Sequence, residues 1–257
     1  MRYPVILLVL IAGPGWATGV LSPNIRISSD VLGYDLQYRT YTPAEYESLA
    51  DLPVLFLTDG PSYISRGGMP RTMDALIESG KIGPLVAVFV DPRDPDDLRN
   101  NRRNRQFLCN EDYLRFFVDE LIPTIEDNYA VARDRGKRTI LGLSFGGTNA
   151  ACFGLLGSDT FSGIGMHSPA NHPVPRLLPA YRRQPRLPLK IFLSTGVPDD
   201  NTRANREFHS VLEEKGYPMK YVETPEGHNW DNWRPLIDDV LLYFYGTDPE
   251  PDPRSGS

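Results

Sequence analysis

The sequence is poor in the side chains that most often bind metals. It has two cysteines and four histidines among 257 residues. Neither Cys109 nor Cys152 has a second cysteine or a histidine at the spacing of metal ligands, so we expect no zinc site, no other metal and no cofactor. Two states remain open for the pair: one disulfide, as in an exported protein, or two buried free thiols.

Excess positive charge and long apolar runs are also lacking. Lysine and arginine number 27 against 33 aspartates and glutamates, a net charge of −6, which argues against nucleic acid as the main partner. The apolar run at residues 4–11 is too short to span a bilayer, and no later stretch is long enough for a membrane helix. The chain has no internal repeat and no linker that would divide it.

The N-terminus resembles a secretory signal peptide. Arg2 precedes the apolar run 4–11, and small residues such as Ala17 follow it. We expect cleavage near Gly19–Val20, so that residues 1–19 form the signal and the mature protein is secreted or periplasmic. A buried N-terminal strand and a lone membrane anchor are the alternatives.

Apolar strands alternate with amphipathic helices through the rest of the chain. We expect strands at 24–28, 34–41, 53–57, 84–90, 138–143, 161–168, 187–194 and 219–223, and helices at 73–78, 111–129, 149–156, 203–215 and 230–245. Polar loops at 91–110 and 169–187 interrupt the pattern. This order predicts one α/β domain over residues 20–246, with a mostly parallel central sheet and helices on both faces. The composition of residues 247–257 predicts a disordered tail.

The stretch around Ser144 predicts a nucleophile elbow. Gly142 and Gly146 flank the serine two residues to either side, between an apolar strand and a helix. Without side chains there, strand and helix can approach closely enough for a sharp turn that exposes the serine hydroxyl. A Gly-x-Ser-x-Gly string occurs by chance in roughly one in ten chains of this length, so the assignment requires partners elsewhere.

A serine nucleophile needs a base and an acid that orients the base. In a parallel sheet, functional residues lie in loops at the carboxyl ends of the strands. Asp199 and Asp200 follow the strand 187–194, and His228 follows the last strand. The order serine, acid, histidine is the order expected for α/β-hydrolases.

His228 is selected from the four histidines by elimination. His209 lies inside a predicted helix, and His172 lies in a proline-rich loop. His167 ends a strand but precedes the acid in the chain, so we expect it to be a packed residue beside the pocket. The acid remains open between Asp199 and Asp200, because only one of two adjacent side chains can face the imidazole.

With these residues in place, the sequence resembles the putative esterase family of α/β-hydrolases, which includes ferric enterobactin esterase-like enzymes, feruloyl esterases and S-formylglutathione hydrolase relatives. The resemblance runs from about Leu32 to Tyr245. The matching stretches are 55–60, 82–92, 142–147 and 226–234, of which the last, Glu-Gly-His-Asn-Trp-Asp-Asn-Trp-Arg, is the most specific. The family's usual spacing implies Asp199, three residues after the strand-ending Gly196, with Asp200 as the alternative.

The α/β-hydrolase fold also predicts where the oxyanion formed on the substrate would bind. One donor is the amide of Phe145, the residue after the nucleophile, and the second comes from the loop at 59–63. Many family members use the residue after the glycine of that loop, but here it is Pro61, which has no N–H. We therefore expect Gly60 or Ser62, or the neighbouring Tyr63, to supply the second donor.

The resemblance implies a serine esterase acting on siderophore, feruloyl, acetyl or small acyl esters, either as small molecules or linked to polysaccharide. Tyr63 and Trp230 are candidates for an aromatic pocket. Arg103 is a candidate clamp for a substrate carboxylate or phenolate, although Gln106 stands where the family has a glutamate. The alternatives are a non-catalytic binding protein of the same fold, and an acyltransferase or peptidase with the same triad.

Overall fold

A computed structural model describes residues 18–247 of the chain. Nearly all of the expected signal peptide and of the expected disordered tail therefore lies outside the described residues. The strands are β1 (Val20–Leu21), β2 (Ile25–Ser29), β3 (Tyr34–Thr42), β4 (Val54–Leu57), β5 (Val86–Asp91), β6 (Arg138–Leu143), β7 (Gly163–His167), β8 (Lys190–Gly196) and β9 (Met219–Thr224). The α-helices are α1 (Gly60–Ser62), α2 (Met69–Glu78), α3 (Arg103–Gln106), α4 (Glu111–Arg115), α5 (Ile122–Asn128), α6 (Phe145–Leu156), α7 (Leu177–Arg183), α8 (Thr202–Glu214), α9 (Trp230–Trp233) and α10 (Ile237–Tyr245).

The described strands form one mixed sheet in the order β1-β3-β5-β4-β6-β7-β8-β9, with β2 also paired to β3. Neighbours from β5 through β9 run parallel, whereas β3 pairs antiparallel with β1, β2 and β5. This arrangement confirms the predicted α/β fold with a mostly parallel sheet. The parallel strands all end at the same edge, which brings the loops that follow β4, β6, β8 and β9 together.

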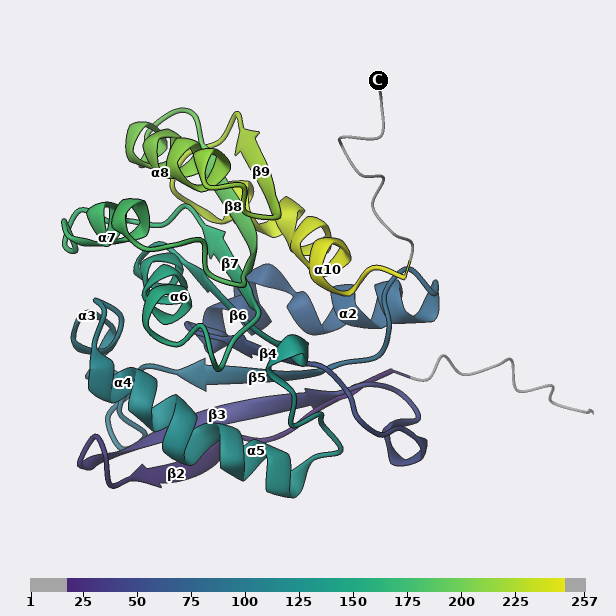
Figure 1. Ribbon diagram of the computed structural model, residues 1–257. Helices are drawn as coiled ribbons and strands as arrows, with labels where there is room; N and C mark the ends of the chain where they lie inside the picture. The colour runs from purple at the N-terminus through teal and green to yellow at the C-terminus, as the bar shows by residue number, and fades with distance from the viewer. Residues whose placement is uncertain (1–17, 248–257) are drawn as a thin grey trace, which may run out of the picture.

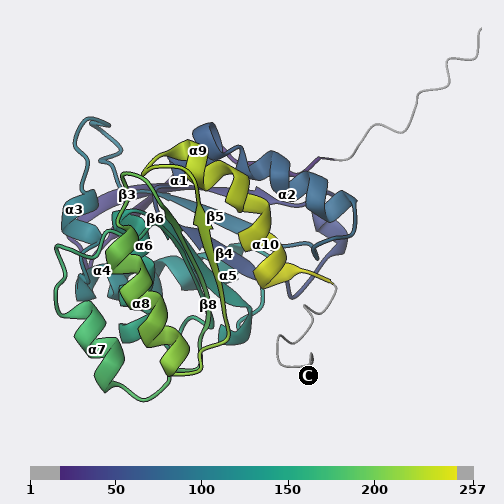
Figure 2. The same ribbon diagram turned by 90° about the horizontal axis from the view of Figure 1, so that it is seen from above.

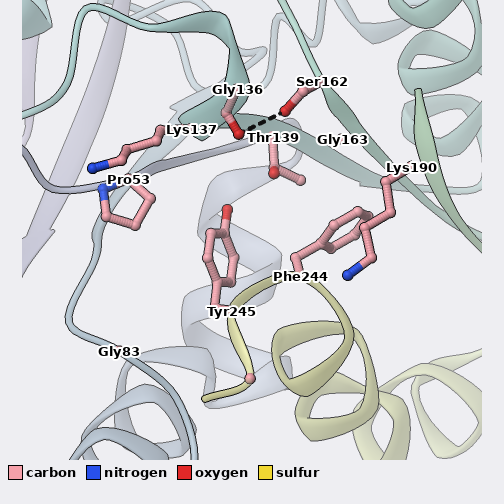
Figure 3. Close-up of a pocket in the computed structure, with 11 residues that line it drawn as sticks. Pro53, Gly83, Gly136, Lys137, Thr139, Ser162, Gly163, Lys190, Phe244 and Tyr245 are labelled. Carbon is pink, nitrogen blue, oxygen red and sulfur yellow. Dashed lines mark hydrogen bonds between the residues drawn. The ribbon is translucent and has the colours of Figure 1, made fainter. Parts of the chain in front are cut away.

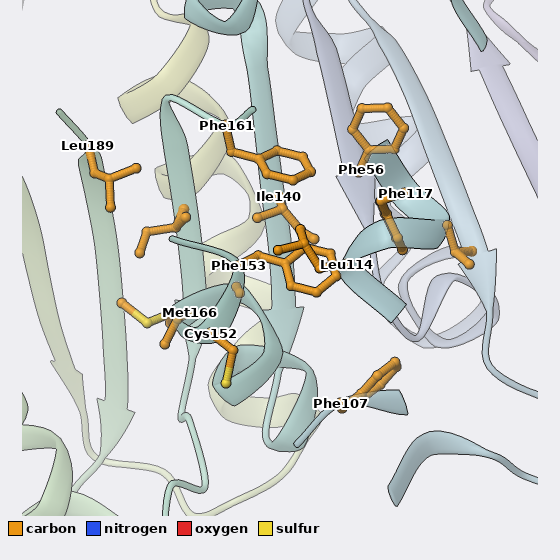
Figure 4. Close-up of a cluster of buried hydrophobic side chains, with 14 of the residues drawn as sticks. Phe56, Phe107, Leu114, Phe117, Ile140, Cys152, Phe153, Phe161, Met166 and Leu189 are labelled. Carbon is orange, nitrogen blue, oxygen red and sulfur yellow. The ribbon is translucent and has the colours of Figure 1, made fainter. Parts of the chain in front are cut away.

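Side chains along the central strands point alternately to the two faces of the sheet, so the core consists of two layers. In β4, Val54 and Phe56 point into one apolar cluster and Leu55 and Leu57 into the other, and all four are buried. The first cluster lies under α4 to α8, and the second lies under α2 and α10 on the opposite face (Figures 1 and 2). Figure 4 shows the aromatic part of the first layer, where Phe117 and Phe153 meet edge to face at 5.1 Å.

Two predicted helices are interrupted for local reasons. The predicted helix 111–129 contains a π-helical turn at Phe116–Leu121, immediately before Pro123. The predicted helix 230–245 is divided by a 3-10 turn that contains Pro235. Proline lacks the N–H that a continuous α-helix needs, so the backbone changes its hydrogen-bond spacing beside each proline.

Three helices, α1, α3 and α7, were not predicted at all, and α2 and α6 both begin four residues earlier than expected. Helix α7 lies within the predicted loop 169–187 and is short, with a proline in its interior, but it buries Leu177 and Tyr181 one turn apart. Helix α6 begins at Phe145 rather than at residue 149, so its N-terminus lies directly beside Ser144. Within residues 18–247, no helix combines the length and apolar character that crossing a membrane requires.

The two cysteines form a disulfide, the first of the two states that the sequence left open. Cys109 and Cys152 are 43 residues apart in sequence, with their Cα atoms 5.0 Å apart. The bond attaches the end of the 91–110 loop to α6, which carries the elbow at its N-terminus. Loop and helix are therefore linked covalently as well as by packing.

We expect that replacing both cysteines by serine lowers the free energy of unfolding by about 2–4 kcal/mol, because the closed loop no longer restricts the unfolded chain. Equilibrium urea unfolding of the oxidised protein and the double variant measures this difference. Reduced wild-type protein is the matched control and should fall to the stability of the variant. An unchanged urea midpoint in both would contradict a stabilising role.

Candidate active site

Ser144 occupies a strained turn between β6 and α6. Its backbone angles are φ 55° and ψ −121°, a combination that costs a non-glycine residue ~1–3 kcal/mol. The glycines on either side are sterically required: a Cβ on Gly142 would lie 2.2 Å from the backbone of Gly146, and one on Gly146 would lie 2.6 Å from Thr58 Oγ1. Strand β6 and helix α6 therefore approach as closely as the sequence predicted, and only glycine fits at these two positions.

His228 lies in the loop after β9 and contacts both other candidate residues. Its Nε2 is 2.8 Å from Ser144 Oγ, and its Nδ1 is 2.7 Å from Asp200 Oδ1. The edge-to-face packing of Trp233, with ring centroids 5.0 Å apart, holds the imidazole on one side. The loops that follow β6, β8 and β9, which were predicted to carry the site, thus meet at the carboxyl edge of the sheet.

The carboxylate of Asp200 is held in its ionised form. Burial opposes ionisation, but hydrogen bonds from His228, from Ser168 Oγ and from the amides of Gly196 and Asn201 outweigh it and lower the pKa of Asp200 to about 2. An ionised carboxylate only accepts hydrogen bonds, so the proton of the neutral imidazole lies on Nδ1. Nε2 is then free to accept the hydroxyl proton of Ser144.

Asp199, the aspartate that the family spacing favoured, does not present its side chain to the imidazole. Its backbone lies in the left-handed region (φ 46°) and its side chain is exposed. Its carbonyl oxygen accepts a hydrogen bond from the amide of His228 at 3.3 Å. This turn directs the next side chain, that of Asp200, toward Nδ1.

Two amides remain free of backbone partners beside Ser144. Phe145 is the first residue of α6, and first-turn amides have no acceptor within their helix. In the 59–63 loop, the amides of Ser62 and Tyr63 both donate to Asp59 O, at 2.9 and 3.4 Å. Gly60 begins α1, so its amide has no acceptor within that helix, and we propose Gly60 rather than Ser62 as the second donor.

Arg103 is turned inward rather than toward a substrate. Its Nε and Nη2 donate to the two carboxylate oxygens of Asp59 at 2.6 and 2.8 Å, and Nη2 also reaches Leu143 O at 3.2 Å. Burial raises the pKa of Asp59, and the guanidinium opposes that shift. The pair therefore joins the loop that carries Gly60 to the last residue before Ser144, in place of the expected anion clamp.

We expect Arg103→Ala to lower the free energy of unfolding by about 3 kcal/mol, because it leaves the carboxylate of Asp59 buried and unpaired. Arg103→Lys, which keeps the charge but loses the paired hydrogen bonds, should lose about half as much. Urea unfolding and steady-state kinetics of both variants provide the test. A raised KM with unchanged stability would instead support the substrate clamp.

The two aromatic candidates for the pocket form a packed pair. Tyr63 is fully buried, and its ring meets Trp230 edge to face with centroids 5.5 Å apart. Tyr63 therefore packs against the buried side of Trp230 and does not line an open pocket. Trp230 remains partly exposed.

Open space lies beside the candidate residues on the side of α7 and α8. A hollow of about 200 Å³ is lined by Asn171, His172, Val174, Pro175, Leu178, Asn201, Ala204, Glu207 and Phe208. A second hollow of about 400 Å³ shares Asn201 and reaches Asp200. Another cavity of about 300 Å³ lies at the opposite edge, around Thr139 and Gly163 where β6 and β7 begin (Figure 3). Ser144 follows the other end of β6, so that cavity is not part of the candidate site.

Four side chains surround the acid in contacts that the sequence did not predict. Ser168 donates to Asp200, and Asn232 and Trp233 donate to Ser168. Asn201 Nδ2 lies 3.4 Å from Asp200 Oδ1. Asn232 and Trp233 belong to the most specific matching stretch, 226–234, so the resemblance contained a signal for them; Ser168 had none.

The strand order, with the serine at the turn between β6 and α6, defines an α/β-hydrolase fold. The sequence profile of the family described as "Putative esterase" matches residues 29–244. The chain belongs to this family and is a carboxylic ester hydrolase.

Two of three curated relatives of the chain are named as esterases. The chain is 26% identical over 228 residues to the uncharacterized protein YjcH of Bacillus subtilis (strain 168), covering 84% of this chain and 94% of the relative. It is 26% identical over 199 residues to an endo-1,4-beta-xylanase/feruloyl esterase of Xylanibacter ruminicola, covering 75% and 26%. It is 25% identical over 158 residues to the iron(III) salmochelin esterase of Escherichia coli O6:H1, covering 61% and 36%. The chain spans only part of these last two proteins.

Solved structures show the same fold. A ferulic acid esterase superposes with a TM-score of 0.77 at 24% identity, covering 89% of this chain and 98% of the other. The enterobactin esterase of Shigella flexneri superposes with a TM-score of 0.77 at 20% identity, covering 86% of this chain and 58% of the other.

Proposed function

We propose that the chain is a secreted or periplasmic serine esterase whose nucleophile, general base and orienting acid are Ser144, His228 and Asp200. The observation that carries this proposal is a continuous pair of hydrogen bonds: Ser144 Oγ donates to His228 Nε2 (2.8 Å), and His228 Nδ1 donates to Asp200 Oδ1 (2.7 Å). A serine hydroxyl is a weak nucleophile unless a base positioned in this way removes its proton.

The reaction proceeds through an acyl-enzyme. Ser144 Oγ attacks the ester carbonyl carbon while His228 Nε2 takes the hydroxyl proton. The ionised Asp200 keeps the other proton on Nδ1 and stabilises the imidazolium. The tetrahedral intermediate collapses, and Nε2 gives its proton to the leaving alkoxide. Water then attacks the acyl-enzyme with His228 again as base, which releases the acid and restores Ser144.

The amides of Phe145 and Gly60 are the proposed oxyanion donors. Both begin helices beside Ser144, and the pairing of Arg103 with Asp59 and Leu143 O holds their two loops against each other. Donors held in place before the reaction stabilise the developing charge without having to reorganise.

The proposed substrates are feruloyl, siderophore, acetyl or other small acyl esters, free or linked to polysaccharide. The names of the relatives support the first two. The hollow of about 200 Å³ between α7 and α8 contributes apolar surface from Val174, Leu178 and Phe208 close to Asp200, which suits a single ring or a short acyl chain.

Export is supported by the N-terminal pattern at residues 1–19 and by the disulfide, since such bonds persist mainly in oxidising compartments. N-terminal sequencing of the protein from its native host should find Val20 or a near neighbour as the first residue. A mature chain that still begins at Met1 would contradict processing.

Activity-based labelling with a fluorophosphonate, followed by a panel of p-nitrophenyl esters, peptide amides and acyl acceptors, tests the proposed function. We expect labelling and turnover of esters. Wild-type protein that is neither labelled nor active would indicate a binding protein, and turnover of amides alone would indicate a peptidase.

A further inference from the structure

Ser168 is a buried hydroxyl at the end of β7 that has no place in the reaction described above. It is fully buried, and its backbone lies in the left-handed region with φ 45°. A serine in this conformation is uncommon, and it persists only where the surroundings impose it. Its amide donates to Ser194 O at 2.8 Å, which anchors the turn to β8.

The hydroxyl of Ser168 uses its full hydrogen-bonding capacity. It donates to Asp200 Oδ2 at 2.6 Å, and it accepts from Trp233 Nε1 at 3.0 Å and from Asn232 Nδ2 at 3.2 Å. One donor and two acceptor sites are all that a serine hydroxyl has. Because the two incoming donors take both lone pairs, the hydroxyl proton is directed to Asp200.

Helix α9 connects this hydroxyl to the imidazole. Trp233 packs edge to face on the ring of His228 while its indole N–H binds Ser168. Asn232 binds Asp200 Oδ2 and Gly227 O, the carbonyl just before His228. One short helix therefore contacts the acid, the base and the hydroxyl that holds the acid.

We propose that Ser168 is a positioning residue: fixed by Trp233 and Asn232, it binds Oδ2 of Asp200 and so holds Oδ1 toward His228. This inference rests on the proposed function and assigns the role of a residue that does not touch the substrate. Without the hydroxyl, Oδ2 of Asp200 keeps its hydrogen bonds from Gly196, Asn232 and Thr195 but loses the one from Ser168, so the carboxylate is held less firmly. Trp233 Nε1 is also left as a buried donor without its partner.

Ser168→Ala should lower kcat for a p-nitrophenyl ester about tenfold to a hundredfold, the range for one lost hydrogen bond to a charged group. KM should stay within about twofold, because the side chain binds no substrate. Ser194→Ala is the matched control: Ser194 is equally buried and bonds His167 instead of the triad. Its kcat should stay within about twofold of wild type.

A positioning role predicts that the loss depends on Asp200. In an Asp200→Asn background, Ser168→Ala should change the single-turnover rate less than about twofold, since the acid it positions is already absent. Trp233→Phe removes the N–H and leaves a smaller aromatic ring beside His228, while Ser168 keeps its own bond to Asp200, so it should lower kcat by less than Ser168→Ala. The double variant Ser168→Ala/Trp233→Phe should have a kcat no lower than that of Ser168→Ala alone.

The outcomes separate this inference from the proposed function. If Asp200→Asn retains wild-type activity, the proposed triad fails. If Asp200→Asn is impaired while Ser168→Ala matches wild type, only the positioning role fails. A Ser168→Ala loss of equal size in the wild-type and Asp200→Asn backgrounds would show a general structural role and overturn the inference.

Discussion

Ser144→Ala is expected to lower kcat/KM for a p-nitrophenyl ester by about 10⁴- to 10⁶-fold and to abolish labelling by a fluorophosphonate. The methyl group cannot form the acyl-enzyme. The hydrogen-bond relay from Asp200 to His228 then has no nucleophile at its end. Residual turnover would come from direct attack of water on the bound ester, with the proposed oxyanion donors stabilising the charge that forms.

The stability of this variant must be measured as a control, because a substitution in a strained turn could unfold the protein. The left-handed backbone at Ser144 is imposed by Gly142 and Gly146, which the variant keeps. We therefore expect the free energy of unfolding of Ser144→Ala, measured in urea, to lie within about 0.5 kcal/mol of the wild-type value. Undiminished labelling of a folded Ser144→Ala protein would place the nucleophile elsewhere.

Asp200→Asn is expected to lower kcat about 10⁴-fold, whereas Asp199→Asn should stay within about twofold of wild type. The amide that replaces the Asp200 carboxylate can donate to Nδ1 and so favour the wrong imidazole tautomer. Asp199 contributes only its carbonyl oxygen to His228, and asparagine tolerates the left-handed backbone found there.

These two neighbouring substitutions make the same chemical change at adjacent positions, so each controls for the other. Steady-state kinetics of both variants with one ester gives the comparison. The assignment of Asp200 would fail if Asp199→Asn were the impaired variant. Equal, near wild-type rates in both would mean that the acid lies outside this loop.

Local patterns were sufficient for the sheet and for the elbow. The run 53–57 is apolar without interruption because β4 is buried on both faces, and this property is visible residue by residue. The Gly142–Gly146 spacing reports a steric requirement that acts within five residues. The interruptions of the helices were harder to predict. An apolar stripe continues across Pro123 and Pro235, although the backbone changes its hydrogen-bond spacing there.

The surroundings of the site depended on contacts between distant segments. Arg103 lies in a polar loop whose sequence suggests solvent or a ligand, but its partner is Asp59, 44 residues away. Tyr63 follows the turn after β4, yet it is covered by Trp230 from the far end of the chain. Neither partner could be inferred from spacing along the chain.

By itself, the sequence determined the α/β class and the order of the central strands, and it led to the proposed pairing of Ser144 with His228, because periodicity, turn glycines and chain order are local or sequential properties. The tertiary structure alone showed the Cys109–Cys152 disulfide, and it alone supports the proposals of Asp200 over Asp199 and of Gly60 over Ser62. Which of two adjacent carboxylates faces an imidazole depends on one backbone angle. Which amide is free depends on the hydrogen bonds that its neighbours have already made.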